Sequence, residues 1–135
     1  MPSTFTAAYG CVLAAALMPI ACAGLAKWGL MRTPRRQGGL DNHHPREWLA
    51  RQTGWRARAN AAQANSFEAL PFFIGAVVIA HQLHAPQMRL DVLAFFFVFV
   101  RLLYVLAYVA DWPTPRSMLW LLGLALNIAI LLLGA

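Results

Sequence analysis

The sequence is short of charge, and of negative charge in particular. Only 12% of its 135 residues are charged, against about 25% in an ordinary soluble domain, and just 5 of them are Asp or Glu. Hydrophobic residues make up 60%, and the mean hydropathy is +0.55. This balance excludes a typical soluble domain and indicates an integral membrane protein. The length predicts a single domain over residues 1–135.

Sequence features typical of nucleic-acid binding and of metal binding are missing. The net charge of +6 would suit nucleic acid, but the basic residues are concentrated in one segment. No basic face is combined with stacking aromatics, so we expect membrane lipids as partners and no nucleic acid. His43 and His44 are adjacent, and no further ligand lies at a suitable spacing, so no metal site is expected.

Cysteine is also rare. Cys11 and Cys22 both lie in the first apolar segment. Eleven residues of helix separate them by about 16 Å along the axis, well beyond the roughly 7 Å that a disulfide allows between Cα atoms. We therefore interpret both as small buried side chains.

Four long apolar segments are what the sequence does contain. Each has the roughly 17–25 residues that a helix needs to cross the hydrocarbon of a bilayer. No Lys or Arg precedes Lys27, so the first segment is expected to be a spanning helix and not a signal peptide. The prediction is an all-α, four-helix transmembrane bundle with helices at about 6–31, 59–83, 90–110 and 117–134.

The connections between these segments predict the orientation. The long loop at 32–55 carries most of the arginines, and the third connection ends in Arg116, whereas the second contains only Arg89. By the positive-inside rule the long loop is cytoplasmic, and both termini lie on the non-cytoplasmic side. Within the loop we expect a short helix from Pro45, with Trp48 and Leu49 against the membrane interface.

Two polar stripes interrupt the apolar pattern. On the second predicted helix, Arg58, Asn65 and Glu68 fall within an arc of about 80°, and on the third, Arg101, Tyr104 and Tyr108 fall within about 60°. An ionisable residue inside a spanning helix is costly and indicates a functional site. Because the two helices are antiparallel, the early part of one stripe and the end of the other should lie at one level, next to Arg116.

Two interpretations of the stripes remain open at this point. Glu68 and Arg101 can form a structural ion pair that fixes how the helices pack. The full set has more cationic and hydrogen-bonding groups than one carboxylate requires, which favours a site for an anion that arginine binds through its carboxylates. The candidate site residues are Arg58, Gln63, Asn65, Glu68, Arg101, Tyr104, Tyr108 and Arg116.

The same residues resemble a known family signature. Arg58-x-x-x-x-Gln63-x-Asn65-x-x-Glu68-x-x-Pro71 is similar to the second helix of the MAPEG proteins, the membrane-associated proteins in eicosanoid and glutathione metabolism. Arg101-x-x-Tyr104-x-x-x-Tyr108, followed by Arg116-Ser117, resembles their third helix and the turn after it. The resemblance covers residues 56–120, and the chain is identified as a prokaryotic-type member.

The resemblance implies a homotrimer that binds glutathione as cosubstrate between subunits, near the cytoplasmic face. Arg58, Gln63, Asn65, Glu68, Arg101 and Tyr104 would then bind the tripeptide. Tyr108 and Arg116 would lie nearest its sulfur and act in catalysis, because a nearby guanidinium favours the thiolate of a thiol whose free pKa is about 8.5. The implied activity is that of a glutathione-dependent transferase or peroxidase acting on hydrophobic electrophiles, in a bacterial inner membrane.

Two other classes of function are weighed against this one. Many catalytic relatives have an arginine four residues before the asparagine, where this sequence has Ala61. A non-catalytic membrane protein of the same fold, which binds a lipid or a partner, is therefore the alternative. A small multidrug exporter would carry an essential carboxylate in its first helix, and residues 6–31 contain none.

Overall fold

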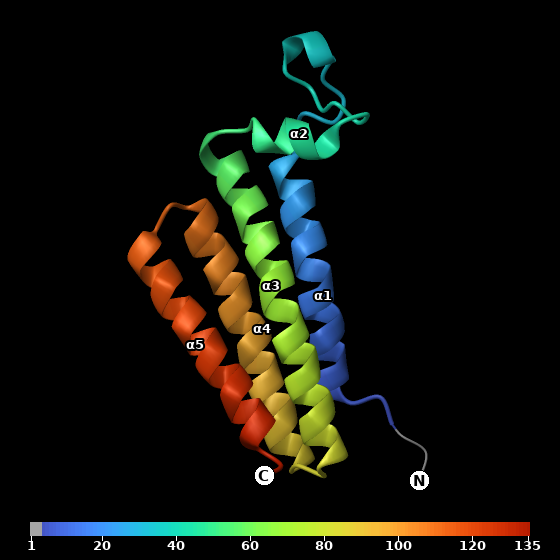
Figure 1. The fold of residues 1–135 in the computed structure, drawn as a ribbon, viewed down its shortest axis with the longest axis vertical. Helices are drawn as coiled ribbons and strands as arrows, with labels where there is room; N and C mark the ends of the chain where they lie inside the picture. Colours follow the sequence, from blue (N-terminus) through green and yellow to red (C-terminus); the bar gives the residue numbers. More distant parts are fainter. Residues whose placement is uncertain (1–3) are drawn as a thin grey trace.

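The computed structural model describes residues 4–135, and within that range all the regular secondary structure is helical (Figure 1). The long helices are α1 (Ala7–Ala26), α3 (Gly54–Gln82), α4 (Gln87–Val109) and α5 (Pro113–Leu132). The short ones are η1 (Arg35–Gln37) and α2 (Pro45–Ala50). Among the described residues, 4 helices are long and apolar enough to cross a membrane, and they are these four long ones. The predicted all-α membrane bundle is confirmed.

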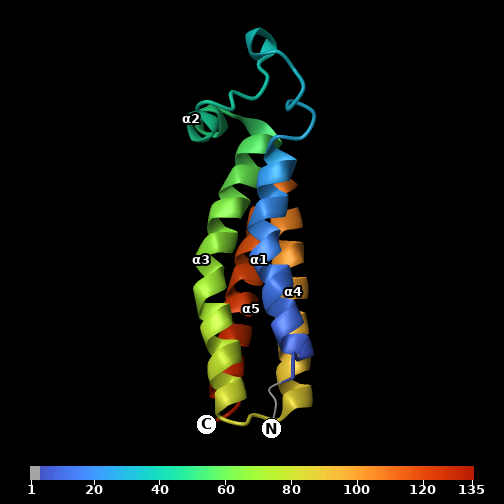
Figure 2. The same ribbon diagram turned by 90° about the vertical axis from the view of Figure 1, so that its right-hand side faces the viewer.

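The four long helices lie side by side along a common direction (Figures 1 and 2). The loop with η1 and α2 covers one end of the bundle, which we call the α2 end. The start of α1 and the C-terminus lie at the opposite end (Figure 1). Each helix is antiparallel to the next long helix in the sequence, so α3 and α5 both run away from the α2 end.

One end of α1 and one end of α3 lie at other residues than the apolar segments predicted. Helix α1 stops at Ala26 instead of continuing to residue 31, and Gly29 with its φ of 78° lies in the turns that follow. Helix α3 begins at Gly54, before the apolar segment from residue 59. Its first turn is fixed by Arg56, whose Nη1 donates to the Ala26 carbonyl at 3.0 Å. Hydropathy marks the part of a helix that suits lipid, and α3 continues past that part.

The apolar side chains of helix α2, which were expected to lie against the membrane interface, pack on the rest of the protein. It begins at Pro45, as predicted, but Trp48 and Leu49 are buried against Ala26 of α1 and Ala59 of α3. The two alanines leave room for these larger side chains at the helix ends. The Trp48 indole donates to the Gly38 carbonyl at 3.4 Å, which attaches the loop to α2.

The apolar core lies toward the opposite end. The rings of Phe73 and Phe97 stack with centroids 4.1 Å apart, and both side chains are buried. Buried alanines such as Ala76 and Ala94 join this cluster and allow the helix backbones to approach closely. Asp91 of α4 accepts the Ala8 N–H at 2.9 Å, so a carboxylate lies at the N-terminus of α1, where the helix dipole favours negative charge.

Candidate functional site

Four side chains form a continuous series near the α2 end, which we call the Arg–Tyr ladder: Arg101, Tyr104, Tyr108 and Arg116. The Arg101 guanidinium lies 4.2 Å from the centroid of the Tyr104 ring, and that of Arg116 lies 4.5 Å from the Tyr108 ring. The two tyrosine rings meet edge to face with centroids 5.8 Å apart. Spacings of three and four residues on α4 place the first three on one face. A guanidinium over an aromatic ring is attracted by the ring's negative face.

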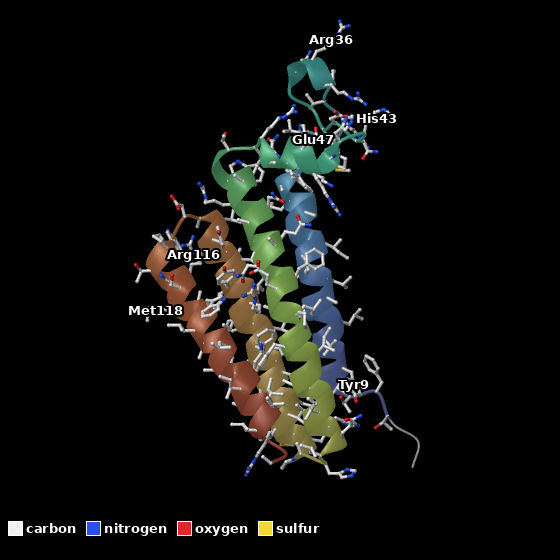
Figure 3. The ribbon with its side chains drawn as sticks, viewed as in Figure 1. Tyr9, Arg36, His43, Glu47, Arg116 and Met118 are labelled. Atoms are coloured by element: carbon white, nitrogen blue, oxygen red, sulfur yellow. The ribbon has the colours of Figure 1, made fainter. Side chains whose placement is uncertain are left out.

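Arg116 is positioned by the turn between α4 and α5. Its backbone N–H donates to the Trp112 carbonyl at 3.1 Å, inside the first turn of α5. Proline at the start of that helix suits a position that has no hydrogen-bond partner for an N–H. Figure 3 shows Arg116 at the end of the bundle where α4 leads into α5. The structure therefore places Arg116 beside Tyr108, at the level expected from the sequence.

A structural ion pair between Glu68 and Arg101 was one of two interpretations left open by the sequence, and within residues 4–135 no ion pair joins the two side chains. Arg101 is 4% exposed, and its Nη2 donates to Ser66 Oγ at 3.4 Å. Glu68 is exposed and accepts a hydrogen bond from Asn65 Nδ2 at 3.4 Å. Ser66 and Glu68 are two positions apart, so they point about 200° away from each other around α3. Arg101 therefore binds α3 through Ser66, although Glu68 and Arg101 line the same cavity.

The remaining predicted residues of α3 have different surroundings. Arg58 Nε donates to the Val109 carbonyl at 3.0 Å, so this arginine binds the last turn of α4. Such a contact complements the negative end of the helix dipole. Gln63 Oε1 and Asn65 Oδ1 are buried and have no hydrogen-bond partner among residues 4–135. A buried acceptor without a partner is costly.

Two neighbouring cavities lie between α4 and α5, and the first of them also borders α3. The first, which we call the α3–α5 cavity, has a volume of about 180 Å³, and its walls include Asn65, Glu68 and Arg101. The second, of about 190 Å³, is lined by Tyr104, Arg116, Ser117, Trp120 and Leu121. Trp120 lines both, so the carboxylate of Glu68 and the guanidinium of Arg116 belong to adjoining spaces. Gln63 lines neither of these two cavities.

Comparison with known proteins decides the family. A model described as the MAPEG family matches residues 7–135. The chain belongs to the MAPEG family. No curated protein and no solved structure matches it. The match extends the resemblance from the two motifs to nearly the whole chain, and it confirms the family predicted from them.

Membership of the MAPEG family fixes the broad character of the protein. The family consists of membrane bundles associated with glutathione, and it includes glutathione transferases and peroxidases beside other members. The four spanning helices agree with that character and place the protein in a lipid environment. The Arg–Tyr ladder and the wall of the α3–α5 cavity contain six of the eight candidate residues, whereas Arg58 binds the Val109 carbonyl and Gln63 lines neither cavity.

Sequence reasoning missed one polar residue of this MAPEG protein. Asn127 of α5 is 4% exposed, lines the α3–α5 cavity, and its Oδ1 has no partner among the described residues. The sequence interpretation started from charged residues, because their cost in hydrocarbon is greatest. An uncharged amide inside the otherwise apolar run from residue 118 to 133 was the signal that would have found it. Trp120, which joins the two cavities, carried no such signal, because tryptophan is common in membrane helices.

Proposed function

We propose that this MAPEG protein binds glutathione and uses its thiolate to attack hydrophobic electrophiles that enter from the membrane. The observation that carries the proposal is the Arg–Tyr ladder beside the two joined cavities. Glutathione has two carboxylates, one ammonium group and one thiol. The walls offer guanidinium groups for the anionic groups and the carboxylate of Glu68 for the ammonium. The ligand chemistry and the wall chemistry therefore match.

Arg116 and Tyr108 are the residues proposed to act on the sulfur. A positive guanidinium near the thiol lowers the pKa of the bound thiol and increases the thiolate fraction at neutral pH. In the transfer reaction the thiolate sulfur forms a bond to an electrophilic carbon, and the leaving group departs with the bonding electron pair. Tyr108, whose ring lies under the guanidinium, holds Arg116 in position. The nucleophile is supplied by the cosubstrate, so no cysteine of the chain is needed.

A homotrimer with the ligand between subunits is part of the proposal. Glu68 is exposed, and no ion pair joins it to a cation within residues 4–135. A carboxylate inside a membrane bundle needs a partner. An ammonium group of the ligand or an arginine of a neighbouring subunit would supply one. A bacterial inner membrane, with the loop containing α2 on the cytoplasmic side, remains the expected location.

The test is glutathione binding to the purified protein in lipid nanodiscs, followed by ultraviolet absorbance of the thiolate across a pH series. We expect the pKa of the bound thiol to lie below its free value of about 8.5. Arg116→Ala should raise that pKa and slow conjugation at neutral pH by about tenfold for each unit of pKa, with the rate recovering at alkaline pH. Arg116→Lys is the matched control, because it keeps the charge and loses the planar group.

Two results would contradict these roles. An unchanged pH profile in Arg116→Ala would remove Arg116 from catalysis and leave it as an interfacial arginine that contacts lipid phosphate. Absence of glutathione binding to the parent protein would favour the alternative, a non-catalytic member that binds a lipid or a partner. Arg58→Ala separates binding from chemistry, since we expect it to weaken glutathione binding and to change the pKa of the bound thiol less.

A further inference from the structure

A further cavity lies away from the candidate site, where α1 ends and the loop begins. Its lining consists of Trp28, Gly29, Met31 and Arg32, and we call it the loop-base cavity. Its volume of about 510 Å³ is larger than that of either cavity beside the Arg–Tyr ladder. This volume is in the usual range of small-molecule pockets, so the cavity has room for a polar group of several atoms.

Two large apolar side chains of this cavity are exposed. Trp28 is 72% exposed and Met31 is 67% exposed. They follow Ala26, the last residue of α1, so they lie where this spanning helix leaves the hydrocarbon. Tryptophan is favoured at the boundary between hydrocarbon and headgroups. The loop-base cavity therefore lies at the level of the lipid headgroups.

The polar part of the cavity is positively charged. Arg32 is exposed in its lining, and a second guanidinium lies next to Gly29, where an added Cβ would be 3.9 Å from Arg56 Nη2. Arg56 is held in place, because its Nη1 donates to the Ala26 carbonyl at 3.0 Å and its guanidinium lies 4.3 Å from the centroid of the Trp55 ring. A cation at that carbonyl also offsets the negative end of the α1 dipole, which would otherwise oppose an anion.

The described chain provides no carboxylate for these two arginines. The carboxylates of the loop are paired with other cations: Asp41 with Arg35 and His44, and Glu47 with Arg51. Neither Arg32 nor Arg56 forms an ion pair within residues 4–135. The cavity is therefore complementary in charge to an anion from outside the chain, and at the headgroup level the membrane supplies phosphate.

We propose that the loop-base cavity binds the headgroup of an anionic phospholipid, with the phosphate at Arg32 and Arg56 and the acyl chains beside Trp28 and Met31. Guanidinium groups match the geometry of phosphate oxygens. A zwitterionic headgroup binds less well, because its ammonium lies near the same guanidinium groups and like charges repel. The exposed apolar side chains favour a lipid over a soluble phosphate. The inference does not depend on glutathione binding or on catalysis.

The experiment follows Trp28 by fluorine NMR, using the full chain labelled with 5-fluorotryptophan in phosphatidylcholine nanodiscs. Phosphatidylglycerol replaces phosphatidylcholine in steps, and Trp28→Phe identifies the resonance. We expect the Trp28 resonance to shift and to saturate while the share of phosphatidylglycerol is still rising. Trp112, which is 60% exposed and lies at the same end of the bundle, is the internal control. Parallel shifts of both resonances without saturation would overturn the proposal, since they would report only the charge of the membrane.

Variants distinguish a site from general attraction by the basic loop. Arg32→Gln should raise the share of phosphatidylglycerol at half-saturation by about fivefold, the loss expected of one arginine near an anionic surface. Arg36→Gln is the matched control, because it removes the same charge from the outer end of the loop, away from the bundle (Figure 3). Screening by salt should limit its effect to less than about twofold. Equal losses in the two variants would overturn the proposal.

A soluble anion provides the last arm of the test. Glycerol phosphate, titrated into nanodiscs of phosphatidylcholine alone, carries the phosphate without acyl chains. We expect it to leave the Trp28 resonance unchanged. The same saturating shift with glycerol phosphate would overturn the assignment to a lipid, since the cavity would then bind a soluble phosphate.

Discussion

The two halves of the bundle differ in whether their buried polar groups have hydrogen-bond partners. Around Phe73, which we call the closed half, the ring stacks on Phe97 and buried alanines fill the space, and the carboxylate of Asp91 accepts two hydrogen bonds. Around the α3–α5 cavity, which we call the cavity half, Asn65 and Asn127 each bury an acceptor that lacks a partner within residues 4–135. A membrane cannot supply the missing bonds. The difference is the basis of the proposal that the closed half maintains the fold and that the cavity half binds ligand.

The largest effect on the free energy of unfolding should follow from removing a buried ring in the closed half. Phe73→Ala removes a fully buried ring from the stack with Phe97, and the space cannot collapse completely. Because lipid is as apolar as the core, the loss comes mainly from packing, and we expect the free energy of unfolding to fall by roughly 2–4 kcal/mol. Unfolding in mixed micelles of increasing denaturing detergent measures it. Glutathione affinity should change little, and a large loss of affinity in a folded variant would mean that the two halves are coupled.

Replacement of Arg101 should have an intermediate effect, and unlike Phe73→Ala it should weaken glutathione binding without lowering the free energy of unfolding. Its buried guanidinium has a hydroxyl and an aromatic ring as partners, and no carboxylate forms an ion pair with it in the described chain. Burying a charge without a counter-charge is costly, so Arg101→Met should leave the free energy of unfolding unchanged or higher. The same variant should lose at least about tenfold in glutathione affinity. Arg101 would then be a residue that serves binding at a cost in stability.

Ser66→Ala is the matched control for Arg101→Met. It keeps the guanidinium and removes the hydroxyl that accepts from it. A buried donor that loses its acceptor costs about 1–3 kcal/mol, so this variant should be less stable than the parent. Both variants are compared in the same detergent unfolding assay. If Arg101→Met were the less stable of the two, the arginine would be a structural group, and the comparison between the halves would fail at this position.

The spanning helices could be predicted because their signal is local. Long apolar runs fix where the chain meets hydrocarbon, and the spacing of Arg101, Tyr104 and Tyr108 fixes which residues share a face of α4. The contact between Arg116 and Tyr108 followed from the short connection between α4 and α5. Family membership could be inferred because the two motifs occur in order on neighbouring helices.

The partners of the buried charges could not be predicted, because sequence spacing does not give the rotation of one helix against another. Glu68 was the obvious carboxylate for Arg101, yet α3 turns Ser66 toward it. Nor did hydropathy show that Trp48 would pack on Ala26 and Ala59 instead of on lipid. Asn127 was not predicted, because an amide costs less in hydrocarbon than a charge does. Each miss concerns a contact between helices and not the existence of a helix.

The smallest effect is expected outside the bundle, where water replaces lipid as the surroundings. Asp41 accepts the His43 N–H at 3.0 Å and lies 3.5 Å from Arg35 and 3.4 Å from His44. Slight desolvation alone would raise the pKa of Asp41, but the His43 hydrogen bond and the two cationic neighbours outweigh it and hold the pKa below its usual value. A lowered pKa in the folded state stabilises the loop above the ordinary pKa, and this contribution is lost as the pH falls through the lowered one.

The loop that contains η1 should therefore loosen in acid while the bundle stays folded. A spin label introduced by Arg36→Cys, with both native cysteines replaced by alanine, reports the mobility of the loop. We expect mobility to rise between about pH 5 and pH 2, the range in which a carboxylate with a lowered pKa is protonated. Asp41→Asn should show the higher mobility at neutral pH and respond less to acid. An equal acid response in Asp41→Asn and in the parent would assign the change to another group. The partners of Asp41 are exposed and screened by water, so we expect their contribution to the stability of the loop to be small.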